Sequence, residues 1–470
     1  MLTRLDLVVI FIYLFGILIF SAFIGRKLDL EGFLVNRRAT KLAFLVFTVV
    51  STNVGAGTIV AVCSAGYSSG IAYGLTFAIV VFIGFLIVAL LASRIKKFGD
   101  KYKAHTFAEF FEKRYSKKTG ILVAVLVLVS YFFWMALQFI AIGSLMKVAT
   151  GWSWNLSLVL SGLIVILYTT LGGIKSDFYT DMIQFWIIFV VLFGILLPTV
   201  LTNIGGWSAF SQLPPTLFSP FSFGGHSFFF GMIATGTLLL IVSMEVWQRI
   251  YAAANVKTAK QAFVIAALIN APVFLVSALL GMGARILFKE IAPEYALFKL
   301  MFKYLPPGIL GLGMAGTLAA FMSSVDSMIM VESATFLKDI YKKLIRPTAS
   351  EDELLKAGRL FTFFFGLIGL VVALVYPRIV EVQLLGFFTL LCFVPAVIGG
   401  LIWKRGNAAA AFISCLTGFI VVFLLFFTRF QKQAFIPAIL ISTVLYIILS
   451  YILPDSDKNL PSISSNFSKP

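Results

Sequence analysis

Charged side chains are scarce in this sequence. Asp, Glu, Lys and Arg make up 12% of its 470 residues, whereas 60% of the residues are hydrophobic. A soluble domain normally carries about 25% charged residues. The composition therefore excludes a soluble enzyme or a soluble binding module and indicates a membrane protein.

Cysteine and histidine are also rare, with three and two copies. Cys63, Cys392 and Cys415 fall within apolar runs, which predicts reduced, packed thiols and no disulfide framework. His105 and His226 lie in separate loops, which argues against a histidine-based metal site. The net charge of +17 fits the basic loops of a membrane protein, so we expect no nucleic-acid partner.

Long apolar runs recur from one end of the chain to the other. A helix needs about 20 residues to cross about 30 Å of hydrocarbon. The alternating pattern of a transmembrane β-barrel is absent. We therefore predict an all-α polytopic protein of the cell membrane, in contact with lipid. The pattern predicts about 13 transmembrane helices, at 5–25, 42–68, 71–93, 121–149, 154–172, 177–201, 227–250, 260–287, 307–341, 354–376, 380–403, 407–428 and 433–453.

Basic residues concentrate in alternate loops, above all at 26–41, 94–118 and 338–359. Lys and Arg are enriched in cytoplasmic loops, so this asymmetry predicts an N-terminus outside and a C-terminus in the cytoplasm. The sequence gives no indication of the oligomeric state.

Two of the predicted spans have small residues at their centres. The sequences "VVSTNVGAGTIVA" (49–61) and "GMIATGTLLL" (231–240) each contain two glycines. Paired discontinuous helices are typical of transporters with inverted repeats, which bind ions and solute at the breaks. We predict two inverted five-helix repeats, at 42–201 and 227–403, with one helix before them and two after. The helices outside the repeats are 5–25, 407–428 and 433–453.

The stretch "LAAFMSSVDSMIMV" (318–331) is apolar but carries an acid among hydroxyls. Ser323, Asp326 and Ser327 share one helix face, with Ser324 at its edge. A carboxylate at mid-membrane costs about 2.5–3.5 kcal/mol. Oxygen ligands with so few charges suit a monovalent cation rather than Ca²⁺. The alternative is that the serines bond to carbonyls one turn back and Asp326 pairs with a basic residue.

Three further acids lie in apolar segments. Asp181, in "LYTTLGGIKSDFYTDMIQFW" (167–186), is the expected partner of Asp326 at a cation site. Glu245 precedes Arg249 by one turn, which predicts a structural ion pair. Glu332 is expected to reach the membrane interface or to meet a lysine.

Four motifs resemble signatures of the sodium/solute symporter family, which includes bacterial proline, pantothenate and sialic acid carriers and the sodium/glucose cotransporters. They are "TTLGGIKSDFYTDMIQ", "VWQRIYAAANVKTAKQA", "GTLAAFMSSVDSMIMVESATFLKDIYKK" and "FVPAVIGGLIWKRGNAAAA", and the correspondence runs from about Gly25 to Gly418. The resemblance implies a leucine-transporter-type fold, which agrees with the predicted repeats.

The resemblance also implies the positions of the ion sites. The family's shared sodium site matches two backbone carbonyls at the first helix break and a carbonyl with two hydroxyls on the later helix. These positions are Ser51, Val54, Ala320, Ser323 and Ser324. Some members add a second sodium site, which matches Asp181, Asp326 and Ser327; a carboxylate at 326 departs from the hydroxyl of that arrangement.

The solute positions transfer less directly. Sugar carriers of the family place an amide and aromatic residues where this chain has Gly236, Leu239 and Leu240. A sugar is disfavoured, because unpaired hydroxyls are heavily penalised in a pocket. The remaining residues expected near the solute are Asn53, Thr58, Gln138 and Ser243, with Phe132 and Trp134 as apolar walls.

Together these features predict a sodium-coupled symporter, not an enzyme, that imports a small amino-acid-like or monocarboxylate-like solute by alternating access. Two alternatives remain. Protons could replace sodium through Asp326, Asp181 and Glu332. The chain could also be a solute sensor with a transporter-like body, although the tail after Pro454 is short for a signalling domain.

Overall fold

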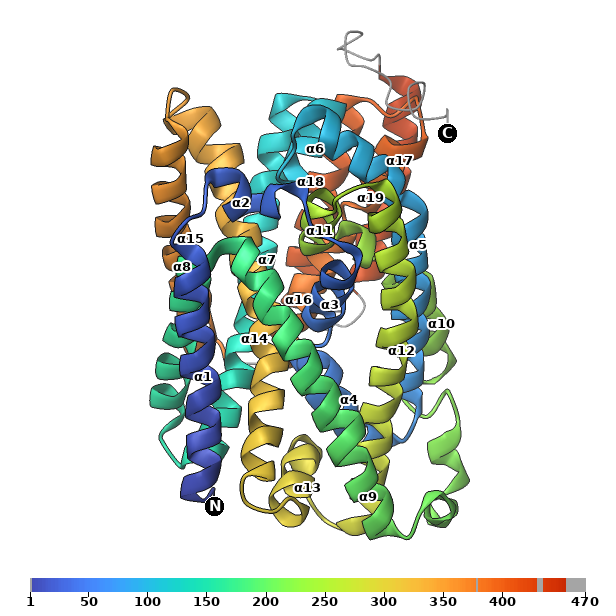
Figure 1. Cartoon of the computed structure of the whole chain (residues 1–470). Coiled ribbons are helices and arrows are strands. Elements are labelled where there is room, and N and C mark those ends of the chain that lie inside the picture. The colour runs from blue at the N-terminus through green and yellow to red at the C-terminus, as the bar shows by residue number, and fades with distance from the viewer. Residues whose placement is uncertain (1, 378, 429–433, 454–470) are drawn as a thin grey trace.

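The computed structural model describes residues 2–377, 379–428 and 434–453, and these residues form helices and loops with no β-strand (Figure 1). Most helices run along one common direction and form an elongated bundle. The helices are α1 (Arg4–Gly25), α2 (Leu30–Val35), α3 (Leu42–Asn53), α4 (Val62–Ser69), α5 (Ala72–Tyr102), α6 (Phe107–Arg114), α7 (Lys117–Thr150), α8 (Trp154–Phe189), α9 (Leu197–Ile204), α10 (Gly225–Gly236), α11 (Met244–Ala252), α12 (Val256–Leu287), α13 (Ala296–Tyr304), α14 (Ile309–Thr335), α15 (Glu351–Val375), α16 (Ile379–Leu391), α17 (Val394–Ile402), α18 (Ala408–Phe426) and α19 (Phe435–Ile452).

The described residues include 11 helices long and apolar enough to cross a membrane, or 12 if one bent pair counts as a span. The predicted number of 13 is not confirmed. The predicted spans 154–172 and 177–201 both fall within Trp154–Ile204, which counts as one candidate span although two helices meet in it at a kink. Gly173 interrupts this stretch with a φ of 57° and a ψ of −170°. This kink lies between the two predicted spans.

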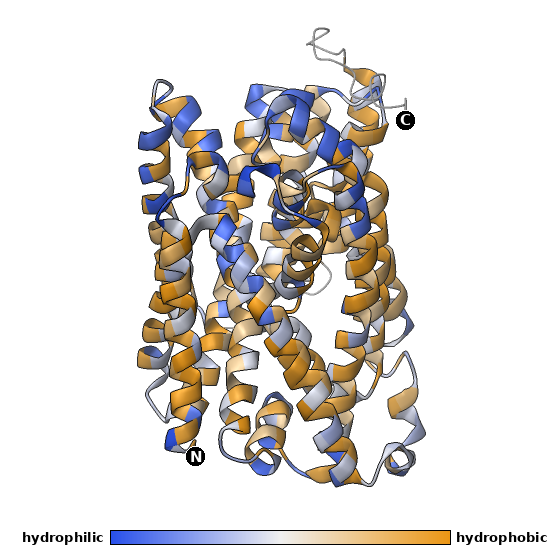
Figure 2. Cartoon of the chain, viewed as in Figure 1, coloured by the Kyte–Doolittle hydropathy of each residue, from blue (hydrophilic) through white to orange (hydrophobic). Residues whose placement is uncertain are grey.

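The outside of the bundle is apolar along most of its length, as Figure 2 shows by residue hydropathy. Large hydrophobic side chains such as Phe23, Leu424 and Val375 are strongly exposed. Hydrophilic residues gather at the end of the bundle where α2 and α6 lie. This distribution is that of a protein whose long faces contact lipid and whose ends contact water.

The first predicted helix break is confirmed. Helix α3 ends at Asn53, and the chain continues through a π-helical turn (Gly57–Ala61) into α4, with a bend of 59° between the two halves. The second break lies later than predicted. Helix α10 runs through Gly231 to Gly236, and the interruption falls at 237–243, before α11 begins at Met244.

Helix α14 is the central element of the fold. It packs against α1, α3, α7, α8 and α15, and almost all of its residues are buried. Small residues permit this close packing. A Cβ at Gly311, for example, would lie 2.7 Å from the Cα of Asp6 in α1. The polar face of α14 therefore points at other helices and not at lipid.

Candidate cation and solute sites

The serine pair of α14 contacts the end of α3, as the predicted shared cation site requires. The Ser323 hydroxyl donates to the carbonyls of Ser51 at 3.0 Å and Ala320 at 3.1 Å. The Ser324 hydroxyl donates to the carbonyls of Thr52 at 2.9 Å and Ala320 at 3.3 Å. Two hydroxyls and three carbonyls thus converge between two helices, and all five are neutral oxygen ligands of the kind that bind alkali cations.

The helix break is what brings α3 so close to α14. Val54 leaves the helical conformation with a φ of −92° and a ψ of 73°. Gly55 then passes the serine pair so tightly that a Cβ there would lie 2.6 Å from Ser324 Oγ. The described hydrogen bonds include none between the Val54 carbonyl and α14. The structure therefore brings Ser51, Ala320, Ser323 and Ser324 together and places Val54 beside them at the break.

One turn farther along α14, three acids form a buried cluster. Carboxylate oxygens of Asp177, Asp181 and Asp326 all lie within 4.8 Å of one another, close enough to hold a metal ion. The Tyr168 hydroxyl donates to Asp326 at 2.7 Å. The Ser327 hydroxyl donates to Asp177 at 3.1 Å. Asp181, Asp326 and Ser327 are thus in one locus, as predicted, and Asp177 belongs to it as well.

The sequence analysis missed Asp177, although its position carried a signal. It precedes Asp181 by four residues, so the two share a helix face. Thr48 and Thr52 of α3 were missed too. The Thr48 hydroxyl donates to Asp181 at 2.5 Å, and the Thr52 hydroxyl lies 3.2 Å from that of Ser327. These threonines were found only through the tertiary contact of α3 with α8 and α14.

The guanidinium of Arg249, from α11, enters this acidic cluster. Its Nη2 donates to Ser327 at 2.7 Å, and it lies 3.2 Å from Asp181 and 3.4 Å from Asp177. The side chain is 1% exposed. The alternative is therefore only partly confirmed: Ser324 and Ser327 bond to carbonyls one turn back, but Arg249 pairs with Asp177 and Asp181 and not with Asp326. Three carboxylates still face one guanidinium.

The predicted ion pair between Glu245 and Arg249 is wrong. Arg249 Nη1 approaches the backbone carbonyl of Glu245, at 3.4 Å, and not its carboxylate. The Tyr131 hydroxyl, on α7, donates to the Glu245 carboxylate and also accepts a 2.7 Å bond from the Met244 amide. Arg249 turns away because the three aspartates offer it more negative charge.

The environment of Glu332 also differs from the prediction. Its side chain is fully buried, and within the described part of the chain neither carboxylate oxygen has a hydrogen-bond partner. It therefore neither reaches the bundle surface nor pairs with a lysine. Its burial follows from its position on α14, which other helices surround.

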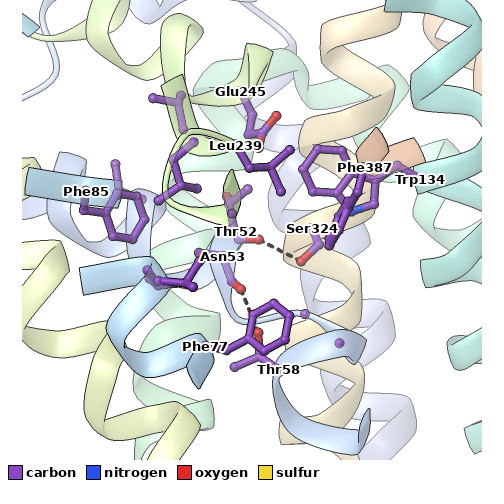
Figure 3. Close-up of a pocket in the computed structure, with 18 of the residues that line it drawn as sticks. Thr52, Asn53, Thr58, Phe77, Phe85, Trp134, Leu239, Glu245, Ser324 and Phe387 are labelled. Carbon is purple, nitrogen blue, oxygen red and sulfur yellow. Dashed lines mark hydrogen bonds between the residues drawn. The ribbon is translucent and has the colours of Figure 1, made fainter. Parts of the chain in front are cut away.

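A cavity of about 120 Å³ lies between the two helix breaks (Figure 3). It is lined by most of the residues predicted near the solute, namely Asn53, Thr58, Gln138, Gly236, Leu239 and Trp134. Ser324 of the cation site also lines it. The cavity thus adjoins the shared site, which would let an ion and a solute influence each other.

Two predicted residues lie outside this lining. The Ser243 hydroxyl is buried and bonds to the Leu239 carbonyl at 3.0 Å, one turn back. Phe132 stacks on Phe365 instead, with 5.8 Å between ring centroids. Both residues belong to segments that border the cavity, but Ser243 bonds back to its own segment and Phe132 packs against α15, so neither side chain lines the cavity.

A sequence model of the Sodium:solute symporter family matches residues 33–418. The chain belongs to this family. The sodium/pantothenate symporter of Haemophilus influenzae is 25% identical over 468 residues, covering 94% of this chain and 95% of the relative. The osmoregulated proline transporter of Bacillus subtilis is 26% identical over 391 residues, covering 77% of each.

Other relatives show how diverse the solutes of this symporter family are. The human high affinity choline transporter 1 is 29% identical over 362 residues, covering 72% of this chain and 60% of the relative. A solved structure of a Na⁺-coupled sialic acid symporter, with substrate bound and open outward, superposes with a TM-score of 0.85. It is 18% identical and covers 96% of this chain and 99% of its own, so the fold is shared.

Membership of the Sodium:solute symporter family confirms several of the predictions made from the sequence. The chain is a sodium-coupled symporter with a transporter fold, it is not an enzyme, and Na⁺ is its co-transported ion. It is a multi-span membrane protein that carries a small-molecule solute.

Proposed function

We propose that this symporter imports a small organic solute, amino-acid-like or monocarboxylate-like rather than sugar-like, by alternating access between the two sides of the cell membrane. The observation that carries this proposal is the cavity between two helix breaks, directly beside a cluster of neutral oxygen ligands. The predicted orientation, with the N-terminus outside, and the inverted repeats at 42–201 and 227–403 complete the proposal.

Sodium binds at the shared site, between the carbonyls of Ser51, Val54 and Ala320 and the hydroxyls of Ser323 and Ser324. The Ser323 hydroxyl now donates to the carbonyls of Ser51 and Ala320, and the Ser324 hydroxyl to those of Thr52 and Ala320, so a bound ion would replace a set of weak internal bonds at small cost. Coupling requires that sodium prefer one conformation, because a ligand that binds two states equally shifts neither. The site joins two helices that separate when the transporter opens inward, which supplies that preference.

The acidic cluster is the proposed second cation site. Asp181, Asp326 and Ser327 were predicted for it, and Asp177 adds a third carboxylate against the single charge of Arg249. Three ionised carboxylates would leave a surplus of negative charge in a buried place, where unpaired charge is strongly disfavoured. A sodium ion or a proton would neutralise that surplus. A sodium ion here would mean that two sodium ions are coupled to transport, whereas a proton would mean that one sodium ion and one proton are coupled.

The available driving force is large enough for uphill import. One positive charge moving through 100 mV releases about 2.3 kcal/mol, and a tenfold sodium gradient adds about 1.4 kcal/mol. One ion per neutral solute therefore supports about 500-fold accumulation, and two ions support about the square of that value.

The test begins with the solute. Thermal stability of purified protein is measured against a metabolite panel in sodium and in potassium, because ligands raise apparent stability by mass action. A solute that stabilises only with sodium is then used for uptake into proteoliposomes at fixed pH, with a sodium gradient or a proton gradient. We expect uptake driven by sodium. Uptake driven by protons alone, or sodium-independent solute binding without transport, would contradict the proposal.

A further inference from the structure

The solute cavity contains one carboxylate without a cationic partner, that of Glu245. Glu245 opens α11, directly after the second helix break, and lines the cavity. Among the described residues, no Lys or Arg nitrogen lies within 4.0 Å of its carboxylate. Figure 3 shows the carboxylate above Leu239, pointing toward the side where Trp134 and Phe387 lie.

Arg249 lines the same cavity but cannot serve as that partner. Its guanidinium pairs with Asp177 and Asp181 of the acidic cluster and donates a hydrogen bond to Ser327. The hydroxyl of Tyr131, which is neutral, donates a hydrogen bond to the Glu245 carboxylate. The Ser243 hydroxyl, the Glu245 backbone amide and the more distant charge of Arg249 also interact with this carboxylate. The start of α11 adds the favourable end of a helix dipole, which tolerates an ionised acid there. Glu245 is therefore held in place and left with its charge facing the cavity.

The walls of the cavity are suited to a positive charge as well. Six aromatic side chains line it: Tyr73, Phe77, Phe85, Trp134, Phe274 and Phe387. Trp134 and Phe387 form an edge-to-face pair, with 4.9 Å between ring centroids, on the side of the cavity toward which Glu245 points. Aromatic faces attract organic cations, most of all when water is excluded.

One further polar group of the lining, the side-chain oxygen of Asn53, also suits a ligand that donates hydrogen bonds. The Asn53 side-chain oxygen is buried without a hydrogen-bond partner among the described residues, and Asn53 lines the cavity. The Gln138 side-chain oxygen already accepts a 3.1 Å bond from the Ala56 amide. The unused oxygen of Asn53 can therefore accept a hydrogen bond from a ligand, whereas Gln138 offers its side-chain NH2 group, which is a donor.

We infer that the solute carries an organic ammonium group, which binds between the Glu245 carboxylate and the Trp134–Phe387 pair. The inference rests on the proposed function, since it assumes that the cavity is the transport site. It assigns to Glu245 the selection of a cation or zwitterion over a neutral or purely anionic solute.

The test compares ammonium compounds with carbon isosteres of the same shape. Choline is paired with 3,3-dimethylbutan-1-ol, and glycine betaine with 3,3-dimethylbutanoate. A panel of small amino acids is paired with their N-acetyl derivatives. Thermal stabilisation of the purified full-length chain is measured for each compound in sodium. We expect at least one ammonium compound to stabilise the protein where its neutral or anionic counterpart does not.

Variants then show which side chains recognise the ammonium group. Glu245→Gln should weaken binding, so that the half-saturating concentration of the ammonium compound rises at least about tenfold. Glu245→Asp, which keeps the charge, should restore part of the affinity. Trp134→Leu should reduce the discrimination between the ammonium compound and its isostere. Glu294→Gln, which changes an exposed acid on a loop, is the matched control and should change nothing.

Sodium stabilisation without solute provides the control for folding and for the proposed function. If it survives in Glu245→Gln while ammonium binding is lost, the inference holds. Equal stabilisation by ammonium compounds and isosteres, or unchanged binding in Glu245→Gln, would overturn the inference and leave sodium coupling intact. Absence of any sodium effect in the wild type would instead contradict the proposed function.

Discussion

Removing the charge of Arg249 should destabilise the protein far more than removing a surface charge. The guanidinium is 1% exposed and lies 3.2 Å from Asp181 and 3.4 Å from Asp177. At an effective dielectric constant of about 20, each such pair has a gross attraction of about 5 kcal/mol, which desolvation largely offsets. Removing one partner, however, leaves the acids buried and unpaired. We therefore expect Arg249→Met to lose about 3–5 kcal/mol of unfolding free energy.

The assay is equilibrium unfolding in mixed detergent and sodium dodecyl sulfate micelles, with Lys260→Met as the matched control. Lys260 is exposed, and its substitution should change stability by no more than about 0.5 kcal/mol. The double variant Arg249→Met/Asp181→Asn should be less damaged than the sum of the single variants, with a coupling of about 1–3 kcal/mol. Equal effects of Arg249→Met and Lys260→Met, or additive single variants, would refute the ion-pair account.

Three further results are expected. Gly236→Leu should abolish uptake but not sodium stabilisation, because a Cβ at Gly236 already lies 3.1–3.2 Å from Met232 and Val80 at the cavity wall; loss of both would indicate misfolding. Reversal potentials should give two cations per solute in the wild type and one in Asp326→Asn, whereas one in both would make Asp326 structural. Burial raises the pKa of Glu31, but His105 and Arg38 outweigh this and lower the pKa from 4.5 to about 2. The ionised Glu31 therefore contributes fully to the unfolding free energy above about pH 4.3, and this contribution is lost as the pH falls toward 2. Glu31→Gln should reduce the dependence of the unfolding free energy on pH in this range.

The features that sequence reasoning predicted well are those fixed by local pattern. Small polar residues around Gly55 predicted the break between α3 and α4, because such a helix is weakly held by its own side chains. The spacing of Ser323 and Ser327 predicted a polar face on α14, and burial of that face against α3 and α8 follows from its chemistry. Family motifs added the carbonyl positions, which no side-chain pattern reveals.

Features that depend on contacts between distant segments were not predictable. Helical spacing favoured a pair between Glu245 and Arg249. The Glu245 carboxylate instead accepts a hydrogen bond from Tyr131, which is far away in sequence. Arg249 finds Asp177 and Asp181 only because α11 packs beside α14 and α3. Hydropathy predicted a pause between residues 172 and 177, but it could not predict the backbone angles of Gly173 that produce the kink there.

The most direct test of the central claim is the sodium dependence of uptake in Ser323→Ala and Ser324→Ala. Each hydroxyl lies at 2.9–3.0 Å from a carbonyl at the end of α3, so each variant would remove one ligand from the proposed sodium site. Initial rates of solute uptake into proteoliposomes are measured across sodium concentrations at fixed pH. The proposed site predicts that the sodium concentration for half-maximal uptake rises at least about fivefold in both variants. Unchanged sodium dependence in both variants would contradict it.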